Sequence, residues 1–400
     1  MLDSERLCPD YLARVESLDF VTPYLPSEVC MGRKQSPILN HNKLKLGFFS
    51  PNCSGGMSVT KVPERWVNSW ENNIALAKLA DESGIEFLLP IARWIGYGGE
   101  TDFHGSVLET LTWATGLLAH TKRINIFATV HTAFIHPVVA AKQLATADQL
   151  GRGRLGLNVV AGWNKPEYDA FGIDLPEKHS DRYALAQEWF DVVTQIWNHH
   201  GPFNWDGHFY HLKNIYGYPR PFDGPPPIMN AAGSGEGRSF AVRNADFLFA
   251  ISVDLEKSKS EVADIKEKAR RINRDTGVFT LCHVVCRPTH KEAEDYYRYY
   301  ADEHADWGAV ENLMNLQGLH AQSFPAEALQ TLRGRFAAGH GTFPLVGDAE
   351  AIVKEMEKIT AAGFAGTTLS FVDYVKEFPY FRDEVIPRLE KKGLRAKFGQ

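Results

Sequence analysis

The chain has 400 residues, of which 44% are hydrophobic and 23% are charged, and its formal net charge at pH 7 is -6. This balance is typical of a globular enzyme, and the length allows two or three domains or one α/β barrel with insertions. The acidic charge argues against a nucleic-acid partner, and no run approaches the roughly 18 consecutive apolar residues of a membrane span.

Residues 1–44 show no sustained periodicity and contain several prolines, so we expect an irregular N-terminal arm that wraps the body or a partner subunit. From residue 45 onward, apolar strand-like runs alternate with amphipathic helix-like stretches. The expected strands are 46–49, 86–90, 124–130, 155–160, 227–231, 246–252, 278–286 and 367–372, and the clearest helices are 70–83, 107–120, 136–150 and 182–197. This alternation predicts an α/β fold, a (β/α)8 (TIM) barrel over residues 45–390; a doubly wound open sheet is the competing architecture.

Two stretches interrupt the alternation. Residues 164–226 contain a helix and then a segment rich in Pro, Gly and aromatic residues, and residues 288–345 form a long insertion before the last strand. Long insertions are usually functional lids or disordered loops, and the apolar content of this one favours a lid. We expect a final amphipathic helix over 378–389 and a solvated C-terminal tail over 391–400.

The cysteines are an odd, scattered set, which indicates reduced thiols in a cytoplasmic protein. Cys282 and Cys286 lie in a strand-like run without metal-ligand spacing, and the sequence has no His-Glu-x-x-His motif. We therefore expect no metal site.

The most informative stretch is 153–168, where a short apolar run ends abruptly in a polar segment. The carboxyl end of a barrel strand is where such proteins bind ligands. An ordinary loop could be equally rich in Gly and Pro, but it would seldom also collect Asn158, Trp163 and Glu167. This stretch therefore predicts a binding site.

A glycine cluster, residues 231–238, follows the fifth strand. The backbone N–H groups near Gly235, the Ser234 hydroxyl and a helix beginning near Ser239 would suit a phosphate group. The spacing is neither a Rossmann motif nor a P-loop, so a strand-to-helix turn without a ligand is the alternative.

Asp181 is a candidate helix N-cap, which would leave Arg182 and Tyr183 exposed in the first helical turn. Arginine suits phosphate, and tyrosine supplies a phenol and a flat face. A surface salt bridge made by Arg182 is the alternative interpretation.

Two further clusters follow the second and third strands. Arg93 and Trp94 precede flexible glycines, which suits a loop covering a planar ring. Thr129 and His131 should point the same way along the third strand, although a lone strand histidine is more often structural than catalytic. Because these clusters share the carboxyl end of one barrel and include no obvious nucleophile, they favour a pocket in which a bound cofactor supplies the reactivity.

Residues 45–390 resemble the bacterial luciferase-like, FMN-dependent monooxygenases. The most specific parts are 141–150, 158–168 and 346–348. Within the family the chain looks most like the dimethylsulfone monooxygenases and the pyrimidine-ring-opening monooxygenase. Residues 51–56 favour the sulfone group, whereas residues 165–168 and the glycine pair at 98–99 favour the pyrimidine group.

The resemblance implies a set of FMN-binding residues, namely Ala92, Arg93, Asn158, Glu167, Arg182, Tyr183, Ser234 and Gly235. It also implies catalytic roles for Thr129, Asn158 and His131, because Thr129 and Asn158 match the pocket where dioxygen meets reduced flavin. Arg93 stands where the pyrimidine enzyme has a lysine, a cation of different shape and hydrogen bonding. His131 stands where that enzyme has an alanine, which points to a different substrate.

The activity implied by the resemblance is that of a two-component monooxygenase. A separate NAD(P)H-dependent flavin reductase would supply reduced FMN, and dioxygen would oxygenate a small organic substrate, cleaving a sulfone or sulfonate C–S bond or a heterocycle C–N bond. A homodimer or homotetramer is expected. The alternatives are a deazaflavin-dependent oxidoreductase, which would use no oxygen, and a non-catalytic flavin-binding protein.

Overall fold

The structure, a computed structural model, describes residues 36–233, 235–252, 254–319 and 326–399. Within these residues, eight parallel strands form a closed barrel. They are β1 (Lys45–Phe49), β2 (Phe87–Leu89), β3 (Asn125–His131), β4 (Leu155–Val160), β7 (Ile228–Ala231), β8 (Phe247–Phe249), β9 (Gly277–Cys286) and β11 (Gly366–Ser370). The pairings of β8 with β9 and of β11 with β1 close the ring. The predicted (β/α)8 barrel is therefore confirmed, and the open-sheet alternative is wrong.

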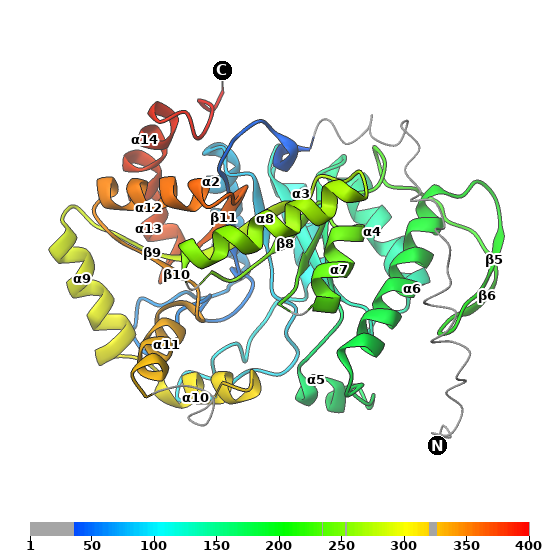
Figure 1. Cartoon of the computed structure of the whole chain (residues 1–400), viewed down its shortest axis with the longest axis horizontal. Helices are drawn as coiled ribbons and strands as arrows, with labels where there is room; N and C mark the ends of the chain where they lie inside the picture. The colour runs from blue at the N-terminus through cyan, green and yellow to red at the C-terminus, as the bar shows by residue number, and fades with distance from the viewer. Residues whose placement is uncertain (1–35, 234, 253, 320–325, 400) are drawn as a thin grey trace.

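Helices surround this barrel (Figure 1). They are α2 (Trp70–Glu82), α3 (Thr110–His120), α4 (Pro137–Gly151), α6 (His179–Asn198), α7 (Gly235–Asn244), α8 (Leu255–Arg271), α12 (Ala349–Ala361), α13 (Tyr374–Glu384) and α14 (Ile386–Lys391). The final helix expected over 378–389 is instead the pair α13 and α14, because the chain breaks at Val385 and Pro387 opens α14. Of the described helices, none is long and apolar enough to cross a bilayer.

Phenylalanine rings fill the barrel interior, and glycines on neighbouring strands make room for them. The Phe87 ring centroid lies 5.8 Å from that of Phe127 and 5.5 Å from that of Phe279. A Cβ atom on Gly47 would lie 2.4 Å from the Phe87 ring, and one on Gly156 would lie 2.4 Å from the Phe127 ring. Because the barrel is packed solid at this level, a ligand has to bind beyond it, as is usual at the carboxyl ends of barrel strands.

The described end of the N-terminal arm closes the amino end of the barrel. Ile38, in the short 3-10 helix η2 (Pro37–Leu39), is fully buried among the interior phenylalanines. The Ser36 hydroxyl and the Ile38 N–H both donate to the Asn125 side chain, at 2.9 and 3.0 Å. Residues 36–44 therefore pack as part of the barrel, and the rest of the expected arm, residues 1–35, lies outside the described residues.

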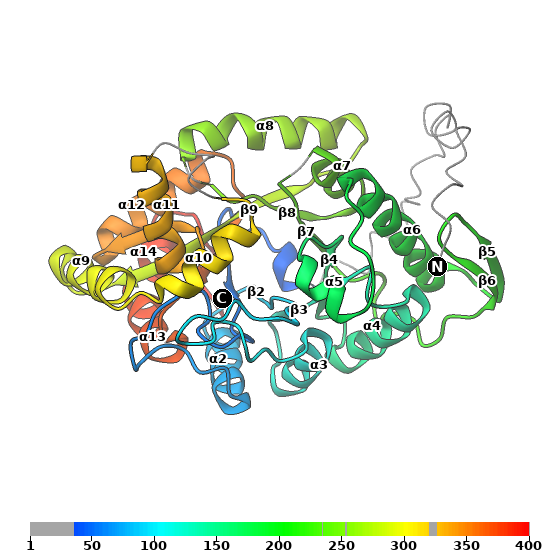
Figure 2. The ribbon, with the colours of Figure 1, turned by 90° about the horizontal axis from the view of Figure 1, so that it is seen from below.

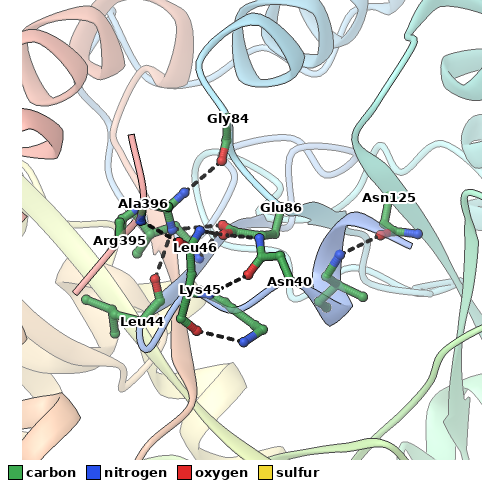
Figure 3. Close-up of polar contacts among 11 residues, drawn as sticks. Asn40, Leu44, Lys45, Leu46, Gly84, Glu86, Asn125, Arg395 and Ala396 are labelled. Atoms are coloured by element: carbon green, nitrogen blue, oxygen red, sulfur yellow. Dashed lines mark hydrogen bonds and ion pairs between the residues drawn. The ribbon is translucent and has the colours of Figure 1, made fainter. Parts of the chain in front are cut away.

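The C-terminal tail also packs against this end (Figure 3). Arg395 is 6% exposed and forms an ion pair with Glu86 at 2.9 Å. Its guanidinium also donates to the carbonyl oxygens of Leu44 and Gly84, at 2.9 and 2.7 Å. The expectation of a solvated tail is wrong at this position, because the buried guanidinium has partners that are far away in sequence.

The insertion at 288–345 is mostly helical. It comprises α9 (His290–Arg298), a π-helical turn η3 (Tyr299–Glu303), α10 (Trp307–Leu316), α11 (Ala326–Gly339) and the strand β10 (Phe343–Gly347). β10 pairs with the far end of β9, outside the closed ring. In Figure 1, α10 and α11 lie at the opposite end of the barrel from the C-terminal tail, and Figure 2 views this carboxyl end with α10 in front of the strands.

The segment 164–226 contributes two further features. The short helix α5 (Lys165–Ala170) lies at the carboxyl end of the barrel, in the connection from β4 to α6 (Figure 2). The strands β5 (Phe203–Asp206) and β6 (His211–Ile215) form an antiparallel hairpin outside the barrel. Of these two features, α5 lies at the carboxyl end and the hairpin does not.

Candidate active site

Three of the predicted clusters meet at Glu167, which α5 holds at the carboxyl end of the barrel. Its Oε1 accepts hydrogen bonds from Arg93 Nη1 at 2.9 Å and from the Trp94 backbone N–H at 2.8 Å. His131 Nδ1, at the end of β3, lies 3.9 Å from Glu167 Oε2. The side chains of Arg93 and Glu167 are only 5% and 1% exposed, so this ion pair is buried.

Asn158 and Thr129 form a second contact on adjacent strands. They are direct neighbours in the register of β4 and β3, and Asn158 Nδ2 donates to Thr129 Oγ1 at 3.2 Å. The Thr129 hydroxyl in turn donates to the Pro90 carbonyl oxygen at 2.6 Å. The threonine is thereby fixed, and it orients the Asn158 amide, whose Oδ1 hydrogen-bonds no described residue.

His131 is uncharged in this setting. Burial, assisted by the nearby Arg93 guanidinium, lowers the pKa of His131 to about 3. At neutral pH the ring therefore offers one N–H donor and one acceptor nitrogen rather than a cation. This state suits hydrogen bonding to a ligand better than general-acid catalysis.

A small cavity lies beside these groups. Its volume is about 50 Å³, and its lining includes Ala92, Arg93, Thr129, His131 and Phe134. Thr129 and His131 thus face the same space, as expected for residues two apart on a strand. The volume admits one or two molecules of the size of water.

The start of α6 differs from the expectation. The helix begins at His179 with Lys178 as its N-cap, so Asp181 lies inside the first turn and is not the N-cap. Arg182 is 7% exposed rather than exposed, and its Nη1 donates to the Gly162 carbonyl oxygen at 3.2 Å. The earlier start turns Arg182 toward the loop after β4, and this contact replaces the surface salt bridge of the alternative interpretation.

Tyr183 places this cluster beside the glycine-rich turn. α7 begins at Gly235, four residues before the expected start near Ser239, and Ser234 lies outside the described residues. A Cβ atom on Gly237 would lie 2.5 Å from the Tyr183 hydroxyl, whereas one on Gly235 would meet nothing within 4 Å. The start of α7 is therefore open at Gly235 and packed against Tyr183 at Gly237, and the N-termini of helices favour anions.

Several buried polar atoms at the carboxyl end have no hydrogen-bond partner among the described residues. They include Asn158 Oδ1, Glu167 Oε2, Arg182 Nε and Asn230 Oδ1. At the amino end, by contrast, both Glu86 oxygens accept two hydrogen bonds each. Since folded proteins rarely leave buried polar atoms unpaired, these acceptors and donors suit a polar heteroaromatic ligand with an anionic group.

Sequence reasoning missed three side chains of this region, Tyr97, His104 and His340. Tyr97 and His104 lie in the loop after β2. His340 directly follows α11, and its ring centroid lies 5.9 Å from that of Tyr97. The aromatic, glycine-rich composition of the loop was a usable signal for Tyr97. No sequence signal marked His340, because its contact with Tyr97 joins segments more than two hundred residues apart.

Comparisons with known proteins identify the family of the chain. The sequence pattern described as luciferase-like monooxygenase matches residues 44–366. Pyrimidine monooxygenase RutA of Enterobacter sp. (strain 638) is 27% identical over 361 residues, which cover 87% of this chain and 96% of that protein. The FMNH(2)-dependent dimethylsulfone monooxygenase of Pseudomonas fluorescens (strain Pf0-1) is 28% identical over 366 residues, which cover 90% of this chain and 98% of that protein.

Among solved structures, DmoA from Hyphomicrobium sulfonivorans matches with a TM-score of 0.79 at 21% identity, covering 89% of each chain, and so has the same fold. The matched pattern spans the barrel from β1 to the start of β11. The chain therefore belongs to the luciferase-like monooxygenase family, a family of oxidoreductases, as its sequence resemblance predicted.

Proposed function

We propose that the chain is a two-component monooxygenase that uses reduced FMN and dioxygen to oxygenate a small organic substrate. The observation that carries the proposal is the group of buried polar atoms around Asn158, Glu167 and Arg182 that no described residue pairs. These atoms lie at the carboxyl end of the barrel, which also carries the start of α7, open at Gly235. The relatives act, by their names, on dimethylsulfone or on pyrimidines, so cleavage of a C–S or C–N bond is the reaction class.

FMN fits the residues present. Its phosphate and ribityl chain would be held by Arg182, Tyr183, Ser234 and Gly235, and its ring by Ala92, Arg93, Asn158 and Glu167. The free acceptor atoms of Asn158 and Glu167 suit the N–H group of a flavin ring. When bound, reduced FMN supplies the electrons that activate dioxygen.

The protein's own groups then position the reactants. Thr129 fixes the Asn158 amide, which acts as an oriented dipole at the reacting centre. His131, held neutral, offers a hydrogen bond to the substrate. The insertion at 288–345 acts as a lid that keeps water from the reaction.

Reduction of FMN is assigned to a separate NAD(P)H-dependent reductase. The sequence carries no Rossmann fingerprint for a nicotinamide cofactor, so the chain has no evident means of reducing the flavin itself. Transfer between two proteins also requires that reduced FMN can enter and leave, which a movable lid permits.

Two measurements test the proposal. Anaerobic titration with reduced FMN and reduced FAD should show tighter binding of FMN. The sequence has one candidate phosphate-binding site, around Arg182 and Ser234, and no second motif for a diphosphate. Oxygen uptake should then rise with product formation when sulfones, sulfonates and pyrimidines are screened as substrates. Substrate turnover that requires a deazaflavin and consumes no oxygen would instead indicate a deazaflavin-dependent oxidoreductase, and FMN binding without any turnover would indicate a binding protein.

A further inference from the structure

The loop after β2 carries two buried polar side chains that the proposed chemistry does not use. Tyr97 and His104 are 2% and 1% exposed, and their ring centroids lie 5.6 Å apart. The Arg93 guanidinium lies 5.0 Å from the Tyr97 ring centroid. The two residues therefore adjoin the buried ion pair between Arg93 and Glu167.

His104 presents a hydrogen-bond acceptor. Its Nε2 lies 2.6 Å from the Gly56 carbonyl oxygen and donates to it, because a carbonyl oxygen can only accept. Burial, with His340 and Arg93 nearby, holds the pKa of His104 well below its usual range, so the ring is neutral. Nδ1 then carries a lone pair, and no described residue hydrogen-bonds it.

Tyr97 presents a hydrogen-bond donor. Burial raises the pKa of Tyr97 to about 12, so the phenol keeps its proton. The Arg93 guanidinium lies within hydrogen-bonding reach of the phenol oxygen and can only donate, so the phenol proton has no acceptor among the described residues. Buried unpaired polar atoms are destabilising and rare, so one donor and one acceptor in a single loop point to a ligand that supplies both partners.

The insertion holds this loop in place. The Thr101 N–H and hydroxyl both donate to Asp306 Oδ2 at 2.7 Å, and Asn312 Nδ2 donates to the Tyr97 carbonyl oxygen at 2.9 Å. The backbone of His104 has a φ of 57°, a left-handed conformation that residues other than glycine rarely adopt. Such strain persists only where surrounding contacts enforce it, and it is common at binding sites.

We propose that Tyr97 and His104 bind the substrate and select a secondary amide or cyclic imide. The substrate C=O accepts from Tyr97 Oη, and the adjacent N–H donates to His104 Nδ1. This inference rests on the proposed monooxygenase function and names the substrate class of that same site. Both atoms are sealed from solvent, so the substrate reaches them when the insertion moves aside.

The proposal distinguishes between the two substrate types of the relatives. A dialkyl sulfone offers oxygen acceptors for Tyr97 but has no N–H group, so it would leave His104 Nδ1 unpaired. A site built around a matched donor and acceptor discriminates strongly against an analogue that lacks one of them.

Calorimetric binding to the full-length, FMN-loaded protein tests this assignment, with the flavin oxidised so that no turnover occurs. Uracil and succinimide offer the N–H and C=O pair, 1,3-dimethyluracil lacks the N–H, and dimethyl sulfone has acceptors only. We expect the last two to bind about 10-fold or more weakly than uracil, the effect of one lost hydrogen bond. Tyr97→Phe and His104→Gln should each weaken uracil binding about 10-fold, and His104→Gln should also reduce the preference for uracil over its dimethyl analogue.

Stability measurements separate this role from a structural one. Tyr97→Phe removes a buried O–H group whose proton has no acceptor among the described residues, so the Tm of the ligand-free protein should be unchanged or higher. Glu100→Gln is the matched control, since Glu100 lies in the same loop with its side chain 73% exposed, and it should leave all affinities unchanged. The proposal is overturned if no imide binds, if dimethyl sulfone binds as tightly as uracil, or if Tyr97→Phe lowers the Tm without changing affinity. Failure of the monooxygenase function would show separately, as absent oxygen uptake with reduced FMN while imide binding persists.

Discussion

Glu167→Gln removes the negative partner of the buried Arg93 guanidinium. Breaking a buried ion pair from one side costs about 3–5 kcal/mol, and the lower end applies here because glutamine still accepts one hydrogen bond. For a chain of this length, about 3 kcal/mol corresponds to a fall in Tm of about 4 °C. We also expect about 10-fold weaker FMN binding, because Glu167 Oε2, which no described residue hydrogen-bonds, is an acceptor reserved for the ligand.

Glu86→Gln is the matched control at the other end of the barrel. Its ion pair with Arg395 has the same 2.9 Å length as that of Glu167 with Arg93, and the side chains are similarly buried. Because both Glu86 oxygens are fully used, the Tm should fall by at least as much while FMN affinity stays unchanged (Figure 3). Thermal unfolding and flavin fluorescence titration measure the two effects. Equal loss of FMN affinity in both variants, or none in Glu167→Gln, would refute the reasoning.

Three further predictions concern catalysis, pH and the insertion. Asn158→Ala should lower product formation roughly 100-fold or more while sparing FMN binding, and normal turnover in stopped-flow experiments with oxygen would contradict this. The pKa of His131 and that of His340 are lowered from 6.5 to about 3, so unfolding takes up protons, and stability should fall as pH drops from about 6.5 toward 3. His131→Gln should reduce the slope at pH 5 by about 1.4 kcal/mol per pH unit in urea unfolding, and an unchanged slope would count against a neutral His131. Shortening the insertion at 288–345 should raise hydrogen peroxide per FMN consumed, unless the segment serves only packing.

The strands were predictable because buried parallel strands are short, almost continuous apolar runs. The strands that the sequence did not reveal lack this pattern. β10 contains Pro344 and pairs only at the overhang of β9, so its neighbours could not be inferred from the alternation. β5 and β6 alternate polar and apolar residues because one face of their hairpin is in solvent. Local composition thus revealed the eight strands of the barrel but not β5, β6 and β10, which lie outside it.

The candidate site was predictable strand by strand, because polar residues follow the apolar runs, but its contacts were not. Arg182 illustrates the limit. The sequence favoured Asp181 as the N-cap and an exposed arginine, whereas the helix starts three residues earlier and Arg182 is buried against the loop after β4. Tyr97, His104 and His340 show a second limit. Their importance comes from burial and from unpaired atoms, and neither property is encoded in the spacing of three residues from separate segments.

The two ends of the barrel use the same chemical group in opposite ways. At the amino end, both carboxylate oxygens of Glu86 accept hydrogen bonds from the arm, the tail and β1. No acceptor atom of Glu86 therefore remains for a ligand. At the carboxyl end, Glu167 uses one oxygen only, and nearby acceptor atoms of Asn158 and His104 likewise lack partners among the described residues. The layer of phenylalanine rings separates the two ends, so packing below it can stabilise the barrel while the groups above it stay available. The unpaired atoms are therefore tolerated because the stability of the fold resides elsewhere, and binding a flavin and a substrate is what would satisfy them.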